Sequence, residues 1–175
     1  MHITFHGGAK SVTGANYLIE HEGIKILVDC GLFQGSRYAE TLNYEKFPYP
    51  ASEIKAVLVT HSHADHMGRL PKLYKEGFRG SIYAAEPAIE IIKAVLPDNF
   101  NLIREEASQD GHPPLFDIED ISNTFGLFKG LSYESPLHLG GGMTAVFHEA
   151  GHILGSAIIE FRWSVNGQEN KLYFT

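Results

Sequence analysis

The stretch His61-Ser62-His63-Ala64-Asp65-His66 decides how this sequence is interpreted. It directly follows residues 56–60 (AVLVT), a short apolar run typical of a buried central strand. Because side chains alternate along an extended chain, His61 and His63 share one face and can reach one cation. Asp65 and His66 come next, where the chain turns toward a helix, and can reach a second cation. Three imidazoles and a carboxylate suit zinc, so the pattern predicts a metal site at a strand end.

Two other segments carry residues that belong with such a site. His152 lies in the glycine-flanked turn 151–155 between two expected strands, where the backbone can pass close to a metal ion. A strand-end histidine is commonly just hydrogen-bonded, and both interpretations stay open for His152 and for His148. Asp29 ends another expected strand, where its carboxylate either orients a metal-binding imidazole or caps a turn. Cys30 follows Asp29 and faces the other way, so we interpret it as a packing residue.

Composition excludes several classes of protein. The chain has 175 residues, 43% of them hydrophobic and 20% charged, as in one globular domain or part of one. A net charge of -7 argues against an electrostatic nucleic-acid clamp, but not against an enzyme that holds phosphates with metal ions. The single cysteine favours a reduced, cytoplasmic location, and no apolar run is long enough to span a membrane.

The periodicity predicts strands at both ends of the chain and helices between them, a layered α/β arrangement. A proline at position 97 is expected to close the second helix, and Asn166-Gly167 to form a hairpin turn. The expected strands are residues 3–6, 16–20, 24–29, 56–60, 81–84, 143–148, 156–165 and 171–175. The expected helices are residues 67–76, 87–96, 99–108 and 117–125.

Basic and aromatic side chains near the first helix offer a weak signal for RNA binding. We expect the four basic residues to form an ordinary solvated face. The four aromatic residues either form a stacking platform for bases or, as we favour, pack a loop over the sheet. The basic residues are Arg69, Lys72, Lys75 and Arg79, and the aromatic residues are Tyr38, Tyr44, Phe47 and Tyr49.

The histidine motif resembles the HxHxDH signature of the metallo-β-lactamase fold superfamily. Asp29 matches the first motif of that superfamily, and His152 matches the third. The phrases GAKSVTGANYLIE, ILVDCGLFQG, VLVTHSHADHMGRLPKLYKEGFRGSIYA and EAGHILGSA resemble its β-CASP branch of RNA-processing nucleases. Within this branch, the sequence is most similar to bacterial and archaeal proteins described as RNA-processing exonucleases.

This resemblance implies an α/β fold, the αβ/βα sandwich, with metal ions between two sheets at one edge. It implies that His61, His63 and His152 hold one zinc ion, and that Asp65 and His66 hold a second. Asp29 would support these ligands rather than bind metal. The implied activity is hydrolysis of RNA phosphodiester bonds by a metal-bound hydroxide, with Asp65 as a catalytic residue that orients the hydroxide.

The sequence departs from the family pattern at its end. In the family, a glycine-aspartate pair follows a strand that ends like residues 172–175, and its aspartate bridges both metals. The chain stops before this pair. We therefore expect residues 1–175 to be the N-terminal part of the domain, with the remainder and the β-CASP insertion downstream. Such a piece would hold one zinc ion or none, show little nuclease activity, and self-associate into a homo-oligomer or be marginally stable.

Two other functions stay open. One is hydrolysis of small molecules on the same fold, as in a thioesterase or a lactonase, which the acidic balance mildly favours. The other is a non-catalytic scaffold subunit of an RNA-processing complex. Such subunits usually lose metal ligands, whereas His61, His63, Asp65, His66 and His152 are all present. The β-CASP-like phrases count against a hydrolase of small molecules, so RNA is the expected substrate of the parent protein.

Overall fold

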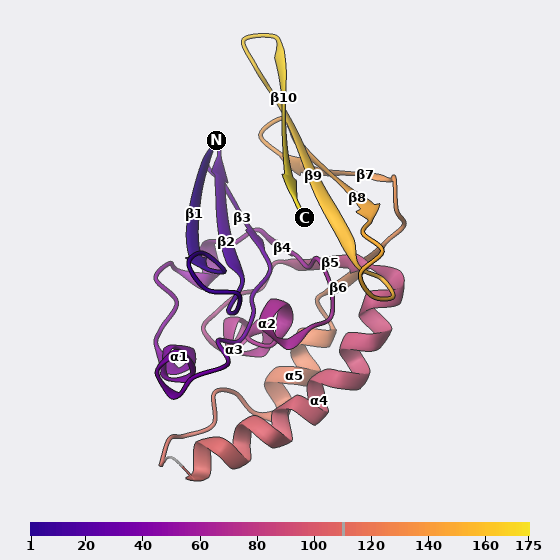
Figure 1. The fold of residues 1–175 in the computed structure, drawn as a ribbon. Coiled ribbons are helices and arrows are strands. Elements are labelled where there is room, and N and C mark those ends of the chain that lie inside the picture. Colours follow the sequence, from indigo (N-terminus) through magenta and orange to yellow (C-terminus); the bar gives the residue numbers. More distant parts are fainter. Residues whose placement is uncertain (110) are drawn as a thin grey trace.

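The computed structural model describes residues 1–109 and 111–175, apart from the side chain at position 106. Two β-sheets face each other, and helices cover the outer side of the first sheet (Figure 1). The first sheet has six strands in the order β1-β2-β3-β4-β5-β6, and the second has four in the order β10-β9-β8-β7. The strands are β1 (His2–Gly7), β2 (Asn16–His21), β3 (Ile24–Val28), β4 (Ala56–Leu58), β5 (Ser81–Ala85), β6 (Phe128–Leu131), β7 (Pro136–Gly140), β8 (Met143–Glu149), β9 (Ala157–Val165) and β10 (Gln168–Phe174).

The first sheet places the metal-type residues at one edge. Strands β1 to β3 run antiparallel, whereas β3 to β6 run parallel to one another. In the parallel register Val28 pairs with Leu58, so β3 and β4 end side by side. Residues that follow these two strands, among them Asp29 and His61, therefore meet at the same edge of the sheet.

Two apolar cores hold the layers together. One lies between the first sheet and the helices, and the other between the two sheets. Leu27 and Val57 face the helices, whereas Ile26 and Leu58 face the second sheet, which explains why β3 and β4 read as continuous apolar runs. Among the described residues, helices cover one outer face only, so the chain contains three of the four layers expected of an αβ/βα sandwich.

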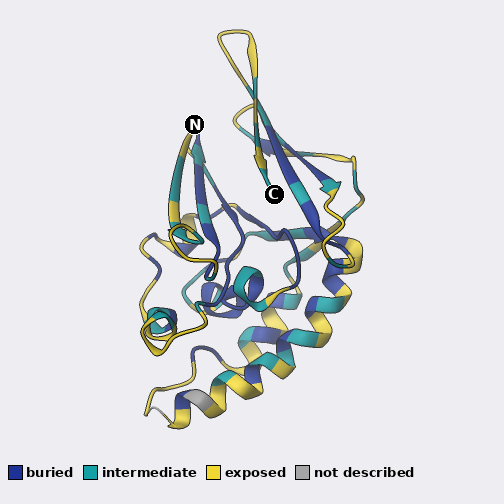
Figure 2. Ribbon diagram, in the orientation of Figure 1, coloured by how far each residue is buried: buried dark blue, intermediate teal, exposed yellow. Residues whose placement is uncertain are grey.

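The helices lie between β3 and β6 along the chain. Figure 2 shows the longest one, α4, with buried residues toward the sheet and α5 and exposed residues away from them. No helix in the described part of the chain has the length and apolarity needed to cross a membrane. The α-helices are α1 (Arg37–Thr41), α2 (Ala64–Met67), α3 (Leu70–Lys75), α4 (Glu86–Gln109) and α5 (Ile118–Phe125), and two short 3₁₀ turns are η1 (Leu42–Tyr44) and η2 (Ala51–Glu53).

Two helix predictions are wrong in their boundaries. The expected helix 67–76 is two short helices, because α2 begins at Ala64 and α3 restarts at Leu70, with a proline in its first turn. The expected stop at Pro97 is absent, and the expected helices 87–96 and 99–108 form one helix, α4, which continues to Gln109. Leu96 and Phe100 on either side of this proline are buried in the core, so packing of this face outweighs the lost backbone hydrogen bond.

Strands β6 and β7 were not expected from the sequence. Strand β6 contains Gly130, and β7 begins at Pro136 and ends at Gly140, so neither has strong strand propensity. Both lie at sheet edges, where pairing with one neighbour is enough. Tertiary pairing, rather than local preference, therefore forms these two strands.

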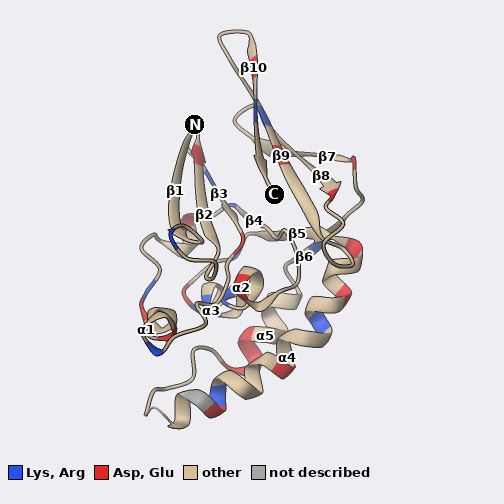
Figure 3. Cartoon of the chain, in the orientation of Figure 1, with Lys and Arg blue, Asp and Glu red and all other residues tan. Residues whose placement is uncertain are grey.

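The basic residues near α3 do not form the expected solvated face. Figure 3 shows basic and acidic residues interspersed along the helices, and two of the four basic residues are buried. The Arg69 guanidinium lies over the rings of Phe33 and Phe47, at 4.5 and 5.2 Å from their centroids. Lys72 donates to the Glu45 carbonyl and pairs with Glu76, the residue that caps the C-terminal end of α3. The prediction is wrong for Arg69 and Lys72 because their stems pack and their charged groups find internal partners.

The aromatic residues of the same region mostly pack inside. Phe47 and Tyr49 are buried and stack with a centroid distance of 5.5 Å, and Tyr44 stacks on His112 at 4.4 Å. Tyr38 is exposed. Three of the four aromatic residues thus pack the loop over the core, as favoured from the sequence.

Candidate metal centre

Three histidines from two distant segments converge at the edge between the sheets. Their ligand-type nitrogens all lie within 4.8 Å of one another. His61 Nε2 lies 3.0 Å from His63 Nδ1, and His152 Nε2 lies 3.4 Å from the same His63 atom. Nitrogens bound to one tetrahedral zinc ion are about 3.3 Å apart. The three rings are therefore close enough to share a single divalent ion.

Thr60 determines which nitrogen His61 presents. The Thr60 hydroxyl has one hydrogen, which it donates to Asp29 Oδ2 at 2.8 Å. It can then only accept from His61 Nδ1, 3.0 Å away, so the proton of that ring lies on Nδ1. The lone pair of His61 Nε2 is left free to face the other two rings. Thr60 was not among the residues expected from the sequence, although it directly precedes the histidine motif.

Asp29 is a buried carboxylate shared by the strand end and α2. Its Oδ1 accepts from the Thr60 backbone N–H at 2.8 Å, and its Oδ2 accepts from His66 Nδ1 at 2.7 Å. Asp29 thus lies beside an imidazole of the motif and outside the three-histidine group. Its backbone has a φ of +59°, in the left-handed region that non-glycine residues seldom adopt.

His66 and Asp65 lie together on α2, one residue apart in sequence. Since His66 Nδ1 donates to Asp29, its Nε2 is free, and this atom lies 3.7 Å from Asp65 Oδ2. The His61 and His66 rings lie 4.0 Å apart between centroids. An imidazole nitrogen and a carboxylate are therefore available next to the three-histidine group, where a second cation would need them.

The loop between β8 and β9 brings His152 to the site. Gly151 and Gly155 in this loop have φ values of +68° and +80°. Ser156 Oγ accepts from the His152 N–H at 3.1 Å and from the Ile153 N–H at 3.2 Å, which fixes the turn. An added Cβ at Gly155 would lie 2.3 Å from the Ala88 backbone nitrogen, so this glycine lets the loop contact α4 closely.

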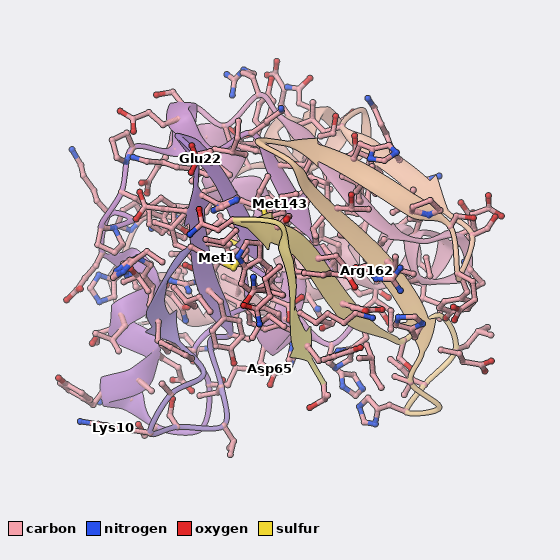
Figure 4. All side chains as sticks on the ribbon, turned by 90° about the horizontal axis from the view of Figure 1, so that it is seen from above. Met1, Lys10, Glu22, Asp65, Met143 and Arg162 are labelled. Carbon is pink, nitrogen blue, oxygen red and sulfur yellow. The ribbon has the colours of Figure 1, made fainter. Side chains whose placement is uncertain are left out.

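A cavity of about 460 Å³ lies over these residues. Its lining includes the three-histidine group, Asp29, Asp65 and His66, and also Tyr17 and Phe174. Figure 4 looks down on the two sheets and labels Asp65, which lies near the end of β10, in agreement with their shared place in the cavity wall. The site is thus open to a substrate on the side where both sheets end.

Burial and mutual repulsion keep the central ring uncharged. Burial, followed by the neighbouring His66, His63 and His152, lowers the pKa of His61 to about 3. Burial alone would lower the pKa of His66 too, but the hydrogen bond and charge of Asp29 raise it above the ordinary value. His61 is therefore neutral at pH 7, and Asp29 holds a proton on His66 Nδ1.

Two other candidates lie outside this group. His148 is hydrogen-bonded on both ring nitrogens, to Glu134 Oε1 and to Glu160 Oε2, each at 2.8 Å. Cys30 is fully buried in the core between sheet and helices, and burial raises the pKa of its thiol to about 12. The packing interpretation of Cys30 is confirmed, and His148 is a structural residue of the second sheet.

The family model for the metallo-beta-lactamase superfamily domain matches residues 18–174 of this chain. The chain belongs to the metallo-beta-lactamase superfamily. A superfamily domain of this kind implies a divalent metal site, and the histidine group lies where the resemblance of HxHxDH predicts it.

Three curated relatives of this metallo-beta-lactamase superfamily chain are named a ribonuclease, a transcription termination factor and an endoribonuclease. Ribonuclease TTHA0252 of Thermus thermophilus is 38% identical over 91% of this chain. Transcription termination factor FttA of Methanosarcina mazei is 32% identical over 91% of it, and endoribonuclease YSH1 of Kluyveromyces lactis is 27% identical over 91%. These names are consistent with the β-CASP branch. The chain spans 34%, 24% and 21% of the lengths of these three relatives, respectively.

Solved structures of the superfamily share the fold. The subclass B3 metallo-beta-lactamase MEM-A1 from a soil metagenome superposes with a TM-score of 0.60 at 17% identity, over 93% of this chain and 56% of that one. BJP-1 of Bradyrhizobium japonicum, of the same subclass, gives 0.56 at 22% identity, over 94% of this chain and 56% of that one. At this identity the likeness establishes the α/β sandwich architecture and nothing about substrate.

Proposed function

We propose that this chain contributes the metal-binding half of an active site that hydrolyses phosphodiester bonds in RNA. The observation that carries the proposal is the convergence of His61, His63 and His152, which are up to 91 positions apart in sequence, on ligand atoms within 4.8 Å. The proposal of RNA as the substrate is supported by relatives named ribonuclease and endoribonuclease.

The donor set of this chain favours zinc as the cation. His61, His63 and His152 would hold one ion, and Asp65 with His66 would hold a second. Imidazole nitrogen with carboxylate oxygen is a set that zinc accepts in catalytic sites. When bound, such ions lower the pKa of water and stabilise negative charge on phosphate oxygens.

The residues of the chain would each contribute a defined task. Asp29 holds the proton on His66 Nδ1, so that Nε2 faces the cavity. Thr60 does the same for His61. Asp65 is partly exposed beside the cavity and is placed to accept a hydrogen bond from a water molecule there. We propose that Asp65 orients the attacking water, as a catalytic residue.

RNA cleavage by the full-length protein tests the proposal. Purified protein should degrade a labelled single-stranded RNA, lose this activity on metal chelation, and regain it with added zinc. Asp65→Ala should fold normally and be at least about 100-fold slower. Cleavage of thioester or lactone substrates with no action on RNA would contradict the proposal, and so would unchanged RNA cleavage by Asp65→Ala.

The cellular setting follows from the same proposal. An enzyme that processes RNA would act in the cytoplasm, and the free, buried thiol of Cys30 suits a reducing compartment.

Because helices cover only one outer face among the described residues, an additional layer or a second copy of the chain would cover the other. Gel filtration of the chain would distinguish a monomer from the homo-oligomer that we expect.

A further inference from the structure

The support for Asp29 extends to two residues outside the metal motif. Asn16 is fully buried at the start of β2, and its Nδ2 donates to the Asp29 carbonyl oxygen at 3.1 Å. Its Oδ1 accepts from the Tyr49 hydroxyl at 2.9 Å. Tyr49 is also buried, in the core between the sheet and the helices. A hydrogen-bonded chain thus runs from Tyr49 through Asn16 to Asp29.

This chain matters because the Asp29 backbone adopts a rare conformation. A left-handed non-glycine residue costs about 1 kcal/mol or more, and it persists where surrounding contacts hold it. The Asp29 N–H is bound by the Leu58 carbonyl at 3.0 Å, but its own carbonyl has left the strand ladder. Asn16 supplies the donor that this carbonyl needs, since an unpaired buried carbonyl would be costly.

The orientation of the Asn16 amide is determined by its neighbours. A carbonyl oxygen can be faced by the NH₂ group and not by the amide oxygen, so Nδ2 must point to Asp29. The amide oxygen then faces the Tyr49 hydroxyl, which donates to it. Removing that hydroxyl would free the amide to rotate and weaken its hydrogen bond to the Asp29 carbonyl.

The same segment contacts the opposite side of the site. The Ala15 N–H donates to the Asp65 carbonyl at 2.9 Å, and the Ala15 carbonyl accepts from the Gly31 N–H at 2.8 Å. Residues 15 and 16 therefore lie between the loop that carries Asp29 and the helix that carries Asp65. A change in this segment would alter the distance between the two.

We propose that Asn16 and Tyr49 are positioning residues for the metal centre, which hold Asp29 in the conformation that directs His66 Nε2 into the cavity. The inference rests on the proposed metal-dependent function. It assigns the two residues a task that goes beyond packing. Neither lines the cavity or lies in the three-histidine group, so both would act through Asp29.

Cobalt titration of the full-length protein tests this inference, with the visible absorption of bound Co²⁺ as the signal. Asn16→Ala should weaken binding of the last cobalt equivalent about 10- to 100-fold and change its absorption, as expected for loss of an outer partner of a ligand. Tyr49→Phe should weaken binding of the last cobalt equivalent less, about threefold, because the Asn16 amide stays present.

Asn43→Ala is the matched control. Asn43 is a buried asparagine that bridges the N–H and carbonyl of Phe33, each at 2.9 Å, without contacting Asp29. It should lower stability yet leave cobalt binding unchanged. Wild-type cobalt affinity and spectrum in Tyr49→Phe would overturn the inference even if Asn16→Ala fails to fold. Equal weakening by Asn43→Ala would overturn it too. Normal cobalt binding without RNA cleavage would contradict only the proposed function.

Discussion

Gly31 lies so close to Asp65 that a Cβ atom added at position 31 would be 1.5 Å from the Asp65 carbonyl oxygen. The loop after β3 and helix α2 are in contact backbone to backbone. The Cys30 N–H donates to the His66 carbonyl at 2.7 Å, and the Leu32 N–H donates to the Ala64 carbonyl at 2.9 Å. The absence of a side chain at position 31 is what allows the loop that carries Asp29 and the helix that carries Asp65 to meet.

Gly31→Ala should therefore separate these segments. We expect a loss of about 2–4 kcal/mol in the free energy of unfolding, because backbone rather than a flexible side chain must move. Urea unfolding of the two proteins would measure it. Gly126→Ala is the control, since its added Cβ would lie 3.3 Å from its nearest neighbour, the Asn123 carbonyl oxygen. Equal stability of wild type and Gly31→Ala would contradict this account of the packing.

His152→Ala should weaken metal binding without unfolding the protein. It removes one of three convergent nitrogens from a loop that Ser156 still fixes. We expect zinc affinity to fall by more than about 100-fold, beyond the effect of losing an outer partner. Competition titration with a chromogenic chelator would measure it. His148→Ala, on the neighbouring strand, should bind zinc as wild type does, and a comparable loss there would contradict the assignment.

Asp29→Asn should change the tautomer of His66. The carboxylate now accepts from His66 Nδ1, whereas the amide nitrogen of asparagine would donate there instead. The ring proton should then move to Nε2, the atom that faces the cavity, and metal affinity should fall about 10- to 100-fold. ¹⁵N NMR of labelled histidine in the metal-free protein distinguishes the tautomers. A proton that stays on Nδ1 would argue against the proposed task of Asp29.

A buried carboxylate on the outer face of the second sheet links three strands. Glu160 on β9 accepts from Arg162 at 2.8 and 2.9 Å, from His148 on β8 at 2.8 Å, and from Tyr173 on β10 at 3.0 Å; Lys171 pairs with it at 3.1 Å. Arg162 is labelled in Figure 4 on the side of the second sheet that faces away from the first. These hydrogen bonds, that of Arg162 foremost, hold the pKa of Glu160 well below its usual range.

Glu160→Gln should consequently destabilise the protein in a pH-dependent way. The ionised Glu160 carboxylate stabilises the folded protein fully above its ordinary pKa of 4.5. This stabilisation is lost as the pH falls from 4.5 toward the lower pKa that Glu160 has in the folded protein. His148 has a raised pKa, so its charge contributes below 6.5 and is lost at higher pH. The difference from wild type, about 1–2 kcal/mol, should be widest between pH 4.5 and 6.5. Thermal unfolding across pH would measure it, with the exposed Glu169→Gln as control.

The sequence predicted those parts of the fold that are encoded locally. The apolar run before His61 marks β4, and Asn166-Gly167 marks the hairpin of β9 and β10. The prediction of a helix end at Pro97 was wrong. The tendency of proline to end a helix is outweighed by packing of Leu96 and Phe100, which only the folded chain brings against the core. Strands β6 and β7 have weak propensity and depend on their partners.

In the candidate site, too, some residues could be predicted from the sequence and others depend on contacts that form only in the folded chain. Ligand-type residues could be found from spacing in His61 to His66, whereas the glycine-flanked turn alone left His152 open, and the resemblance to the third superfamily motif assigned it to the site. Thr60 and Asn16 could not, because their tasks depend on a hydroxyl and an amide meeting Asp29 across the sheet edge. Common polar residues carry no pattern of their own, so their contribution becomes visible only when their partners are known.

X-ray diffraction of zinc-loaded protein at the zinc absorption edge tests the central claim most directly. The account predicts an anomalous peak about 2.0–2.1 Å from His61 Nε2, His63 Nδ1 and His152 Nε2. A folded protein whose zinc binds elsewhere, or that takes up no zinc with these three rings in place, would contradict it.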